Sequence, residues 1–200
     1  MSCQIEPSTI EATIAFHGHS CPGLAIGIRA AEIALREMPG IHQTDLVCVT
    51  ETDMCGVDAI QFLTGCTYGK GNLIHRDVGK MAFSFFDRGS GRGIRLLFNQ
   101  QSRGGLHQEM VALMGKNPLS EAEQQRLQEL RADMQERLMT LPADELFTVQ
   151  PLDQPPPRPA RVLASLVCES CGESTMESRT RRFAGKTLCI PCYGTVEQKI

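Results

Sequence analysis

The sequence predicts an α+β protein with a mixed or antiparallel sheet and packed helices, followed by a small cysteine-rich domain. In the first half of the chain, a helix–strand–helix pattern precedes a run of short strands, which is typical of an α+β sheet rather than a doubly wound one. Further on, a proline-rich stretch precedes two Cys-x-x-Cys pairs. We therefore expect a core domain at 1–150, a stiff linker at 151–163 and a second domain at 164–200.

Composition and charge exclude several classes of protein. The net charge of −3 provides no broad field for nucleic acid or a membrane surface. No stretch reaches the ~18 apolar residues of a membrane span, and the first sixteen residues lack the basic start and apolar core of a signal peptide. Nine cysteines without an export signal favour a protein of the reducing cytoplasm, whose thiols bind metals or take part in reactions. Disulfide bonds are the alternative.

Two helices are expected near the start of the chain. Ser8 and Glu11 have the spacing of a capping box, which predicts a helix that begins there, runs toward Phe16 and ends at Gly18. A second helix is expected from Pro22 to Met38, capped by Ser20 or Cys21. Its predicted core face comprises Leu24, Ile28, Ala31 and Leu35, and its predicted charged stripe comprises Arg29, Glu32 and Arg36.

The middle of the chain predicts the sheet. The mostly β-branched run 46–50 indicates a buried strand, and 57–63 a short helix. Further strands are expected at 73–76, 80–88 and 93–98, the last two forming a hairpin. After Gly104-Gly105 we expect a helical stretch at 107–114, then a long helix opened by Ser120 with Glu123 three residues on. The narrow apolar seam of this long helix is expected to pack on the sheet or on another subunit.

The cysteine-rich domain carries the clearest chemical signal. Cys168, Cys171, Cys189 and Cys192 form two Cys-x-x-Cys pairs separated by seventeen residues. Four thiolates at this spacing can surround one tetrahedral Zn²⁺, and zinc would supply folding free energy to a domain with few apolar residues. The sequence therefore predicts a structural zinc site in this domain. Arg179, Arg181 and Arg182 lie between the pairs; they offer phosphate contacts, although a solvated hairpin that contacts protein is the favoured interpretation.

A second site is expected in the core domain. His17, His19, Cys21, Cys55 and Cys66 are typical transition-metal ligands, and all fall at predicted turns or element ends. Cys21 has an alternative role as a reactive thiolate, because a helix N-terminus favours that form. Cys48 and Cys3 are interpreted as inert thiols. His42, His75 and His107 are interpreted as surface or hydrogen-bonded side chains.

Two further residues complete the expected core site. Asp58, on the short helix, can orient a ligand from outside the coordination shell. Lys70 lies in the glycine-rich stretch 64–72 and can neutralise an anionic substrate. This stretch lacks the spacing of a P-loop and follows a helix instead of a strand, so a nucleoside triphosphate is not the expected ligand. Cys55, Cys66, Asp58 and Lys70 are the candidate catalytic residues, and Cys55 and Cys66 are also candidate metal ligands.

The motifs at 17–23, 55–61, 64–72 and 79–83 resemble the FmdE family, which takes its name from the E subunit of formylmethanofuran dehydrogenase. The cysteine-rich domain is similar to the zinc-ribbon or treble-clef module of some members, and its residues 168–173 resemble the zinc finger of TraR/DksA regulators. The resemblance implies an α+β core that commonly dimerises, with a metal or thiol site formed by these motifs. The namesake enzyme is a tungsten or molybdenum pterin complex that reduces carbon dioxide onto methanofuran.

The resemblance does not transfer that reaction, because the family extends to organisms without that pathway. This chain also has no evident pterin or iron–sulfur signature of its own. It favours a cytoplasmic homodimer that is accessory to an oxidoreductase of one-carbon or molybdenum/tungsten metabolism, with an enzyme complex as partner. The expected cofactors are a structural Zn²⁺ in the tail and a second transition metal, Zn²⁺ being one candidate, in the core. The alternative is a metal- or ligand-sensing regulator whose tail contacts nucleic acid or polymerase, which near-neutral charge makes the less favoured interpretation.

Overall fold

The computed structural model describes residues 3–42 and 44–196. The chain divides into two compact units, Met1–Pro159 and Ala160–Ile200, which we treat separately. No helix among the described residues has the length and apolar character that crossing a bilayer requires.

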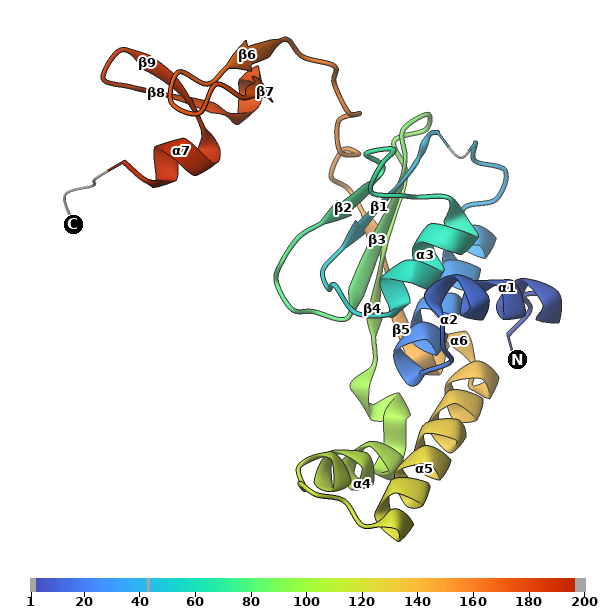
Figure 1. The fold of residues 1–200 in the computed structure, drawn as a ribbon. Helices are drawn as coiled ribbons and strands as arrows, with labels where there is room; N and C mark the ends of the chain where they lie inside the picture. Colours follow the sequence, from blue (N-terminus) through green and yellow to red (C-terminus); the bar gives the residue numbers. More distant parts are fainter. Residues whose placement is uncertain (1–2, 43, 197–200) are drawn as a thin grey trace. The chain divides into compact units, whose positions relative to one another are not determined.

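The first unit is built on a five-stranded mixed sheet (Figure 1). Its strand order is β2-β1-β3-β4-β5, with β1 parallel to β2 and every other neighbouring pair antiparallel. The strands are β1 (Leu46–Thr50), β2 (Leu73–His75), β3 (Ala82–Asp87), β4 (Gly93–Phe98) and β5 (Phe147–Leu152). Together with the helices packed on the sheet, this confirms the predicted α+β class.

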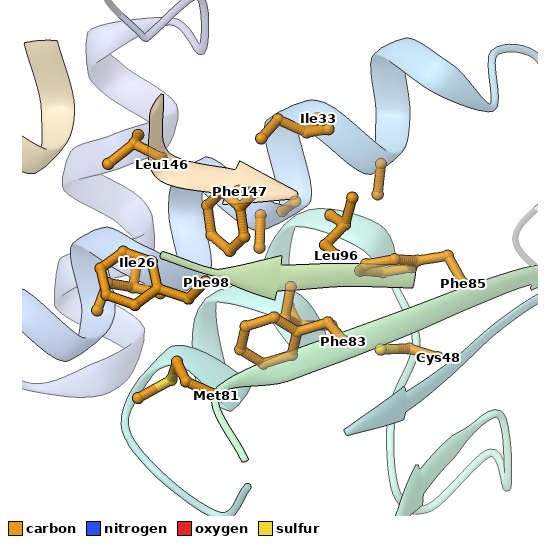
Figure 2. Packing of buried hydrophobic residues seen from close by; sticks show 14 of the residues in the cluster. Ile26, Ile33, Cys48, Met81, Phe83, Phe85, Leu96, Phe98, Leu146 and Phe147 are labelled. Atoms are coloured by element: carbon orange, nitrogen blue, oxygen red, sulfur yellow. The ribbon is translucent and has the colours of Figure 1, made fainter. Parts of the chain in front are cut away.

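Six α-helices accompany the sheet in the first unit's described residues. They are α1 (Pro7–His17), α2 (Pro22–Glu37), α3 (Gly56–Thr64), α4 (Gly104–Met114), α5 (Glu121–Thr140) and α6 (Ala143–Leu146), with a 3-10 turn η1 (Gln100–Arg103) before α4. Ile26 and Ile33 of α2 belong to the apolar core that also contains Phe83 and Phe85 of β3 (Figure 2). The helix α2 is therefore the central helix of this domain.

Local signals in the sequence explain several of the helix ends. The capping box predicted at Ser120 and Glu123 is present at the start of α5. Cys21 caps α2, with its Sγ accepting a hydrogen bond from the backbone N–H of Leu24. The box predicted at Ser8 is absent: α1 begins one residue earlier, at Pro7, because proline is well accommodated in the first turn of a helix.

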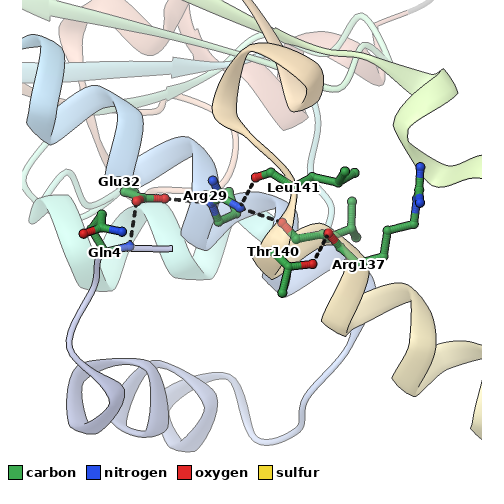
Figure 3. A network of polar contacts seen from close by, with 7 residues as sticks. Gln4, Arg29, Glu32, Arg137, Thr140 and Leu141 are labelled. Carbon is green, nitrogen blue, oxygen red and sulfur yellow. Dashed lines mark hydrogen bonds and ion pairs between the residues drawn. The ribbon is translucent and has the colours of Figure 1, made fainter. Parts of the chain in front are cut away.

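The charged stripe predicted on α2 is wrong for two of its three members. Every residue from Leu24 to Ala34 is buried, since the sheet, α3 and α5 surround this helix. Arg29, only 1% exposed, donates from Nε to Glu32 and from Nη1 to the carbonyls of Leu138 and Leu141 (Figure 3). Leu35, predicted on the core face, is instead 41% exposed.

The edge strand β5 extends into the predicted linker. Its residues Pro151 and Leu152 pair with Ile94 and Gly93 of β4. Proline is tolerated there because β5 is an edge strand, with no further neighbour that requires its missing N–H. The chain that follows lies against the same unit, where Arg88 donates to the carbonyls of residues 157 and 158.

The second unit consists of two short hairpins and a terminal helical turn. The strands β6 (Ser165–Val167) and β7 (Ser174–Met176) form one hairpin, and β8 (Thr180–Phe183) and β9 (Lys186–Cys189) form the other. A 3-10 turn η2 (Glu177–Arg179) separates them, and α7 (Ile190–Gly194) follows β9. Among the side chains described in this unit, Cys168, Leu188 and Cys189 are the buried ones.

Candidate metal centres

Two groups of side chains, among those the structure describes, bring their donor atoms together closely enough to hold a metal ion. The core cluster comprises His17, His19, Cys21 and Cys55, and the tail cluster comprises Cys168, Cys171, Cys189 and Cys192. Within each cluster, one donor atom from every residue lies within 4.8 Å of the others. Imidazole and thiolate donors at this separation suit Zn²⁺ and related transition metals.

Helix ends and the turn between the first two helices position the donors of the core cluster. His17 is the last residue of α1, and Gly18 ends that helix in the left-handed conformation, with φ of 92°. This turn directs the chain back so that Cys21 can cap α2. Cys55 precedes α3 in the corresponding N-cap position. The two thiols are therefore presented by the N-termini of two adjacent helices.

Glycines allow those two helices to approach closely. A Cβ at Gly27 of α2 would lie 2.1 Å from the carbonyl oxygen of Gly56 in α3, so only glycine fits at this contact. Gly23 lies beside the thiols, and a Cβ there would come within 3.2 Å of Cys55 Cβ and 3.9 Å of Cys21 Sγ. In the sequence, Gly23 is recognised only as part of the motif at 17–23. Gly23 and Gly27 are one helical turn apart, and this spacing is the signal in the sequence that could have predicted a close contact between α2 and another helix.

A carboxylate fixes one of the imidazoles. His17 Nδ1 lies 2.6 Å from Asp58 Oδ2 and donates a hydrogen bond to that carboxylate. The other ring nitrogen, Nε2, lies 4.0 Å from Cys21 Sγ. Carboxylate–imidazole pairs of this kind orient histidine ligands and raise their basicity in metal sites. Asp58 thus lies where the sequence predicts an orienting residue.

The remaining donors differ in exposure. His19 is exposed, and its ring lies 4.4 Å from the His17 ring, centroid to centroid. Cys55 is half-buried, and desolvation followed by a hydrogen bond with Cys21 raises the pKa of its thiol. A divalent ion between these donors would favour the thiolate by direct coordination. The donor set therefore fits a transition metal, with His19 as its most accessible member.

Cys66 lies outside this cluster, contrary to the expectation that it would converge on the site. Its side chain is fully buried in the apolar core, and its Sγ donates to the carbonyl of Leu46 at 3.5 Å. Burial raises the pKa of this thiol, and the nearby Lys70 charge opposes that shift. The loop 64–72 turns its cysteine inward, because Asn72 also donates to the Leu46 carbonyl, at 3.0 Å. Lys70 itself is exposed on this loop.

The other cysteines and histidines of the first unit lie outside the core cluster. Cys48 is fully buried in β1. The half-buried Cys3 packs at the edge of a small apolar cluster. His42 Nδ1 lies 2.7 Å from the Thr44 hydroxyl, and His107 Nε2 lies 3.4 Å from Arg103 Nη1. Burial, together with the Arg103 charge, lowers the pKa of His107.

The tail cluster is held mainly by backbone hydrogen bonds. The N–H of Cys189 donates to Cys168 Sγ, and the N–H of Cys192 donates to Cys189 Sγ. Backbone N–H groups of Cys171, Cys189 and Ser170 lower the pKa of Cys168 to about 6. Such bonds stabilise the thiolate of Cys168, which is the form that binds Zn²⁺, whereas a hydrogen bond with Cys189 raises the pKa of Cys192 to about 12. The cluster therefore fits the structural zinc site that the sequence predicts.

Comparisons with known proteins match both units. Residues 16–148 match the family model described as "FmdE, Molybdenum formylmethanofuran dehydrogenase operon". Residues 163–198 match the "Prokaryotic dksA/traR C4-type zinc finger". A crystal structure of a "tungsten formylmethanofuran dehydrogenase subunit e (fmde)-like protein" from Syntrophus aciditrophicus has a TM-score of 0.65 at 23% identity. The match covers 96% of this chain and 94% of that one, so the two share a fold.

A curated protein of Archaeoglobus fulgidus is also similar. It is named "Probable S-adenosyl-L-methionine-binding protein" and is 30% identical over 192 residues. The match covers 90% of this chain but 51% of that protein, so the chain spans about half the length of this relative.

Proposed function

The chain belongs to the FmdE family, and from this premise we propose that its core domain is a transition-metal protein accessory to an enzyme of one-carbon or molybdenum/tungsten metabolism. The observation that carries the proposal is the core cluster of His17, His19, Cys21 and Cys55. Three of its donors come from helix ends that are fixed by packing, and Asp58 orients His17.

The four donors have different parts in the proposed centre. His17, Cys21 and Cys55 are half-buried and form its permanent ligands, while the exposed His19 fills a position that an incoming molecule can take. A zinc-type ion held there supplies Lewis acidity to an oxygen or sulfur atom of that molecule. Because Nδ1 of His17 is hydrogen-bonded to Asp58, Nε2 is the ring nitrogen proposed to bind the metal.

Two candidate catalytic residues lie apart from the donors. Lys70 is exposed on the glycine-rich loop and is proposed to attract an anionic group of the substrate. Cys66 has no part in the proposed centre, because its thiol is fully buried and bonded to the Leu46 carbonyl. Cys55 and Asp58 are therefore the candidate catalytic residues that also belong to the metal site.

A protein partner beside this site is part of the proposal. Phe16 precedes His17 and is 55% exposed, and its ring lies 5.5 Å from that of Phe62, which is 40% exposed. Exposed aromatic pairs are typical of interface centres. We propose that a second copy of the chain or a subunit of an enzyme complex covers this surface, in a reducing cytoplasm.

Metal stoichiometry tests the core centre. The zinc-loaded wild-type chain should contain two equivalents of metal, and Cys55→Ser should contain one. Cys66→Ser is the matched control and should retain two. A wild-type protein with a single equivalent, or a Cys55→Ser variant with two, would show that the core cluster is not a metal centre.

One observation supports the second candidate function, a regulator that contacts nucleic acid through its tail. Arg179, Arg181 and Arg182 are exposed, and none forms an ion pair within the described part of the chain. Guanidinium groups without a carboxylate partner on a small zinc finger offer contacts to phosphates. Salt-dependent DNA binding that is lost in the triple alanine variant would support this function, whereas equal binding by the variant would exclude it.

A further inference from the structure

A small cavity lies directly beside the core cluster. It has a volume of about 180 Å³ and lies between α1, α2 and α5. Apolar side chains form most of its wall: Ile10, Ile14, Leu24, Ala25, Ile28 and Met139. Its polar members are Ser20, Gln135 and the exposed Glu136, with the Ser20 hydroxyl bonded to the Gln135 side chain.

Cys21 belongs to both the cavity and the core cluster. Its side chain lines the cavity, and it packs with the apolar cluster around Leu24 and Ile28. The same residue provides one of the four donors that lie within 4.8 Å of one another. The cavity and the core cluster therefore adjoin each other at Cys21.

We propose that this cavity receives the apolar group of a small molecule whose polar head binds at the core centre. The inference rests on the proposed function of that centre and adds a substrate class to it. The cavity opens to solvent on the side of the exposed Ser20 and Glu136, and the buried Leu24 and Ile28 form part of its apolar wall. An apolar cavity of about 150 Å³ can hold a benzene molecule. The substrate class is thus a metal-binding head with an uncharged aliphatic or aromatic group of about six carbon atoms or fewer.

The chemistry of the walls sets this specificity. The apolar wall side chains offer no partner to a charged or strongly polar group, whose burial there would be costly. Glu136, beside the cavity, repels an anionic tail in addition. A hydroxylated or charged analogue should therefore bind more weakly than its alkyl counterpart.

A series of hydroxamates tests the proposal on the full-length protein. Hydroxamates bind Co²⁺ and Zn²⁺ through two oxygen atoms, and the Co²⁺-loaded protein reports their binding as a change in its visible spectrum. The tail site has four cysteine ligands and no open position, so this change reports the core centre alone. Each buried methylene group should strengthen binding about fourfold. We therefore expect butyrohydroxamate to bind at least tenfold more tightly than acetohydroxamate.

Cavity-filling variants identify where the alkyl chain lies. Ile14→Phe should abolish the gain from acetohydroxamate to butyrohydroxamate while leaving the affinity for acetohydroxamate within twofold. Ala15→Phe, on the exposed side of the same helix, is the matched control and should keep the gain. Affinities that are independent of chain length, or equal effects of the two variants, would overturn the proposal.

A second measurement separates failure of the cavity from failure of the metal centre. A core that binds no Co²⁺ refutes the proposed function and gives no spectral change. The methyl resonances of Ile14 and Met139 are then followed with isobutanol as the probe, because this measurement needs no metal. A saturable shift of the Met139 methyl that Ile14→Phe removes and Ala15→Phe keeps would support an apolar ligand site, and unchanged Ile14 and Met139 resonances in the wild type would exclude it.

Discussion

The two donor clusters differ in what holds their side chains in place. Three of the core donors sit at the ends of α1, α2 and α3, and His19 lies in the turn between the first two. The helices α2 and α3 pack into a large apolar cluster that includes Phe83, Phe85 and Leu96. The tail donors sit on short hairpins and on the helical turn α7, where, among the described residues, Leu188 is the buried side chain other than cysteine. Packing therefore determines the donor positions in the core, whereas in the tail the donors themselves make up most of what is buried. A metal is expected to be optional for folding in the first unit and necessary in the second.

Removal of metal should produce the largest difference between the units. Chelation should unfold residues 165–195, because little besides metal binding offsets the cost of ordering that unit. The core should remain folded. Hydrogen exchange read by mass spectrometry should show complete loss of protection in the tail and retention in β1, β3 and β4. A tail that stays protected after its metal has been removed would contradict this comparison, and added Zn²⁺ should restore protection.

Loss of the buried ion pair of the core should have the next largest effect. Arg29→Met leaves the Glu32 carboxylate and two carbonyls without their partner, and breaking a buried pair costs about 3–5 kcal/mol. Urea unfolding monitored on the core measures this loss. Arg36→Met, on the exposed side of the same helix, is the control and should change the free energy of unfolding by less than ~0.5 kcal/mol. Equal losses in the two variants would show that the network does not stabilise the core.

The Asp58–His17 contact should affect metal affinity more than stability. Asp58→Asn should weaken metal binding at the core about 10- to 100-fold, because such carboxylates orient and polarise their histidine. The tail affinity should not change. Competition with a chromophoric chelator measures both sites, and Asp53→Asn at a nearby exposed position is the control. An unchanged core affinity would show that Asp58 has only a structural part.

The smallest expected effect is a pH-dependent contribution to the stability of the sheet. Arg95 binds Glu51 through two hydrogen bonds, of 2.6 and 2.9 Å, and lowers the pKa of that carboxyl. The stabilising contribution of this contact is thus complete above the unfolded glutamate pKa of about 4.3 and is lost as the pH falls through the lower folded value. Glu51→Gln should cost about 1–2 kcal/mol at pH 7.

Unfolding of the wild type and Glu51→Gln from pH 7 down to pH 3 checks the sign of this contribution. The difference between the two proteins should shrink below pH 4. A difference that stays constant, or that grows on acidification, would show that the Arg95 contact does not depend on an ionised carboxylate.

Local signals predicted much of this fold because their causes are local. The capping box of α5, the hairpin between β3 and β4, and the buried strand β1 depend on residues close in sequence. The geometry of each Cys-x-x-Cys pair is also determined locally, since each pair spans one turn. The tail cluster is accordingly the most complete agreement between the sequence and the structure.

The differences arise where distant segments decide the environment. Arg29 looked like a surface residue because its partners, the carbonyls at the end of α5, lie more than a hundred positions away. Cys66 looked like a ligand because the sequence does not show which way a glycine-rich loop turns its side chains. The convergence of Cys21 and Cys55 could be anticipated only in outline, since it depends on the contact between Gly27 and Gly56.

The Gly27–Gly56 contact also bears on how this site could be altered by evolution or by protein engineering. The spacing of the two thiols depends on two backbones that touch, with no side chain between them to adjust. The cavity walls contributed by α1 and α5 do not take part in that contact. Substitutions at Ile14 or Met139 can therefore change which molecules are accepted while the distance between Cys21 and Cys55 is preserved. Ligand preference and donor geometry are in this sense separately adjustable properties of one small site.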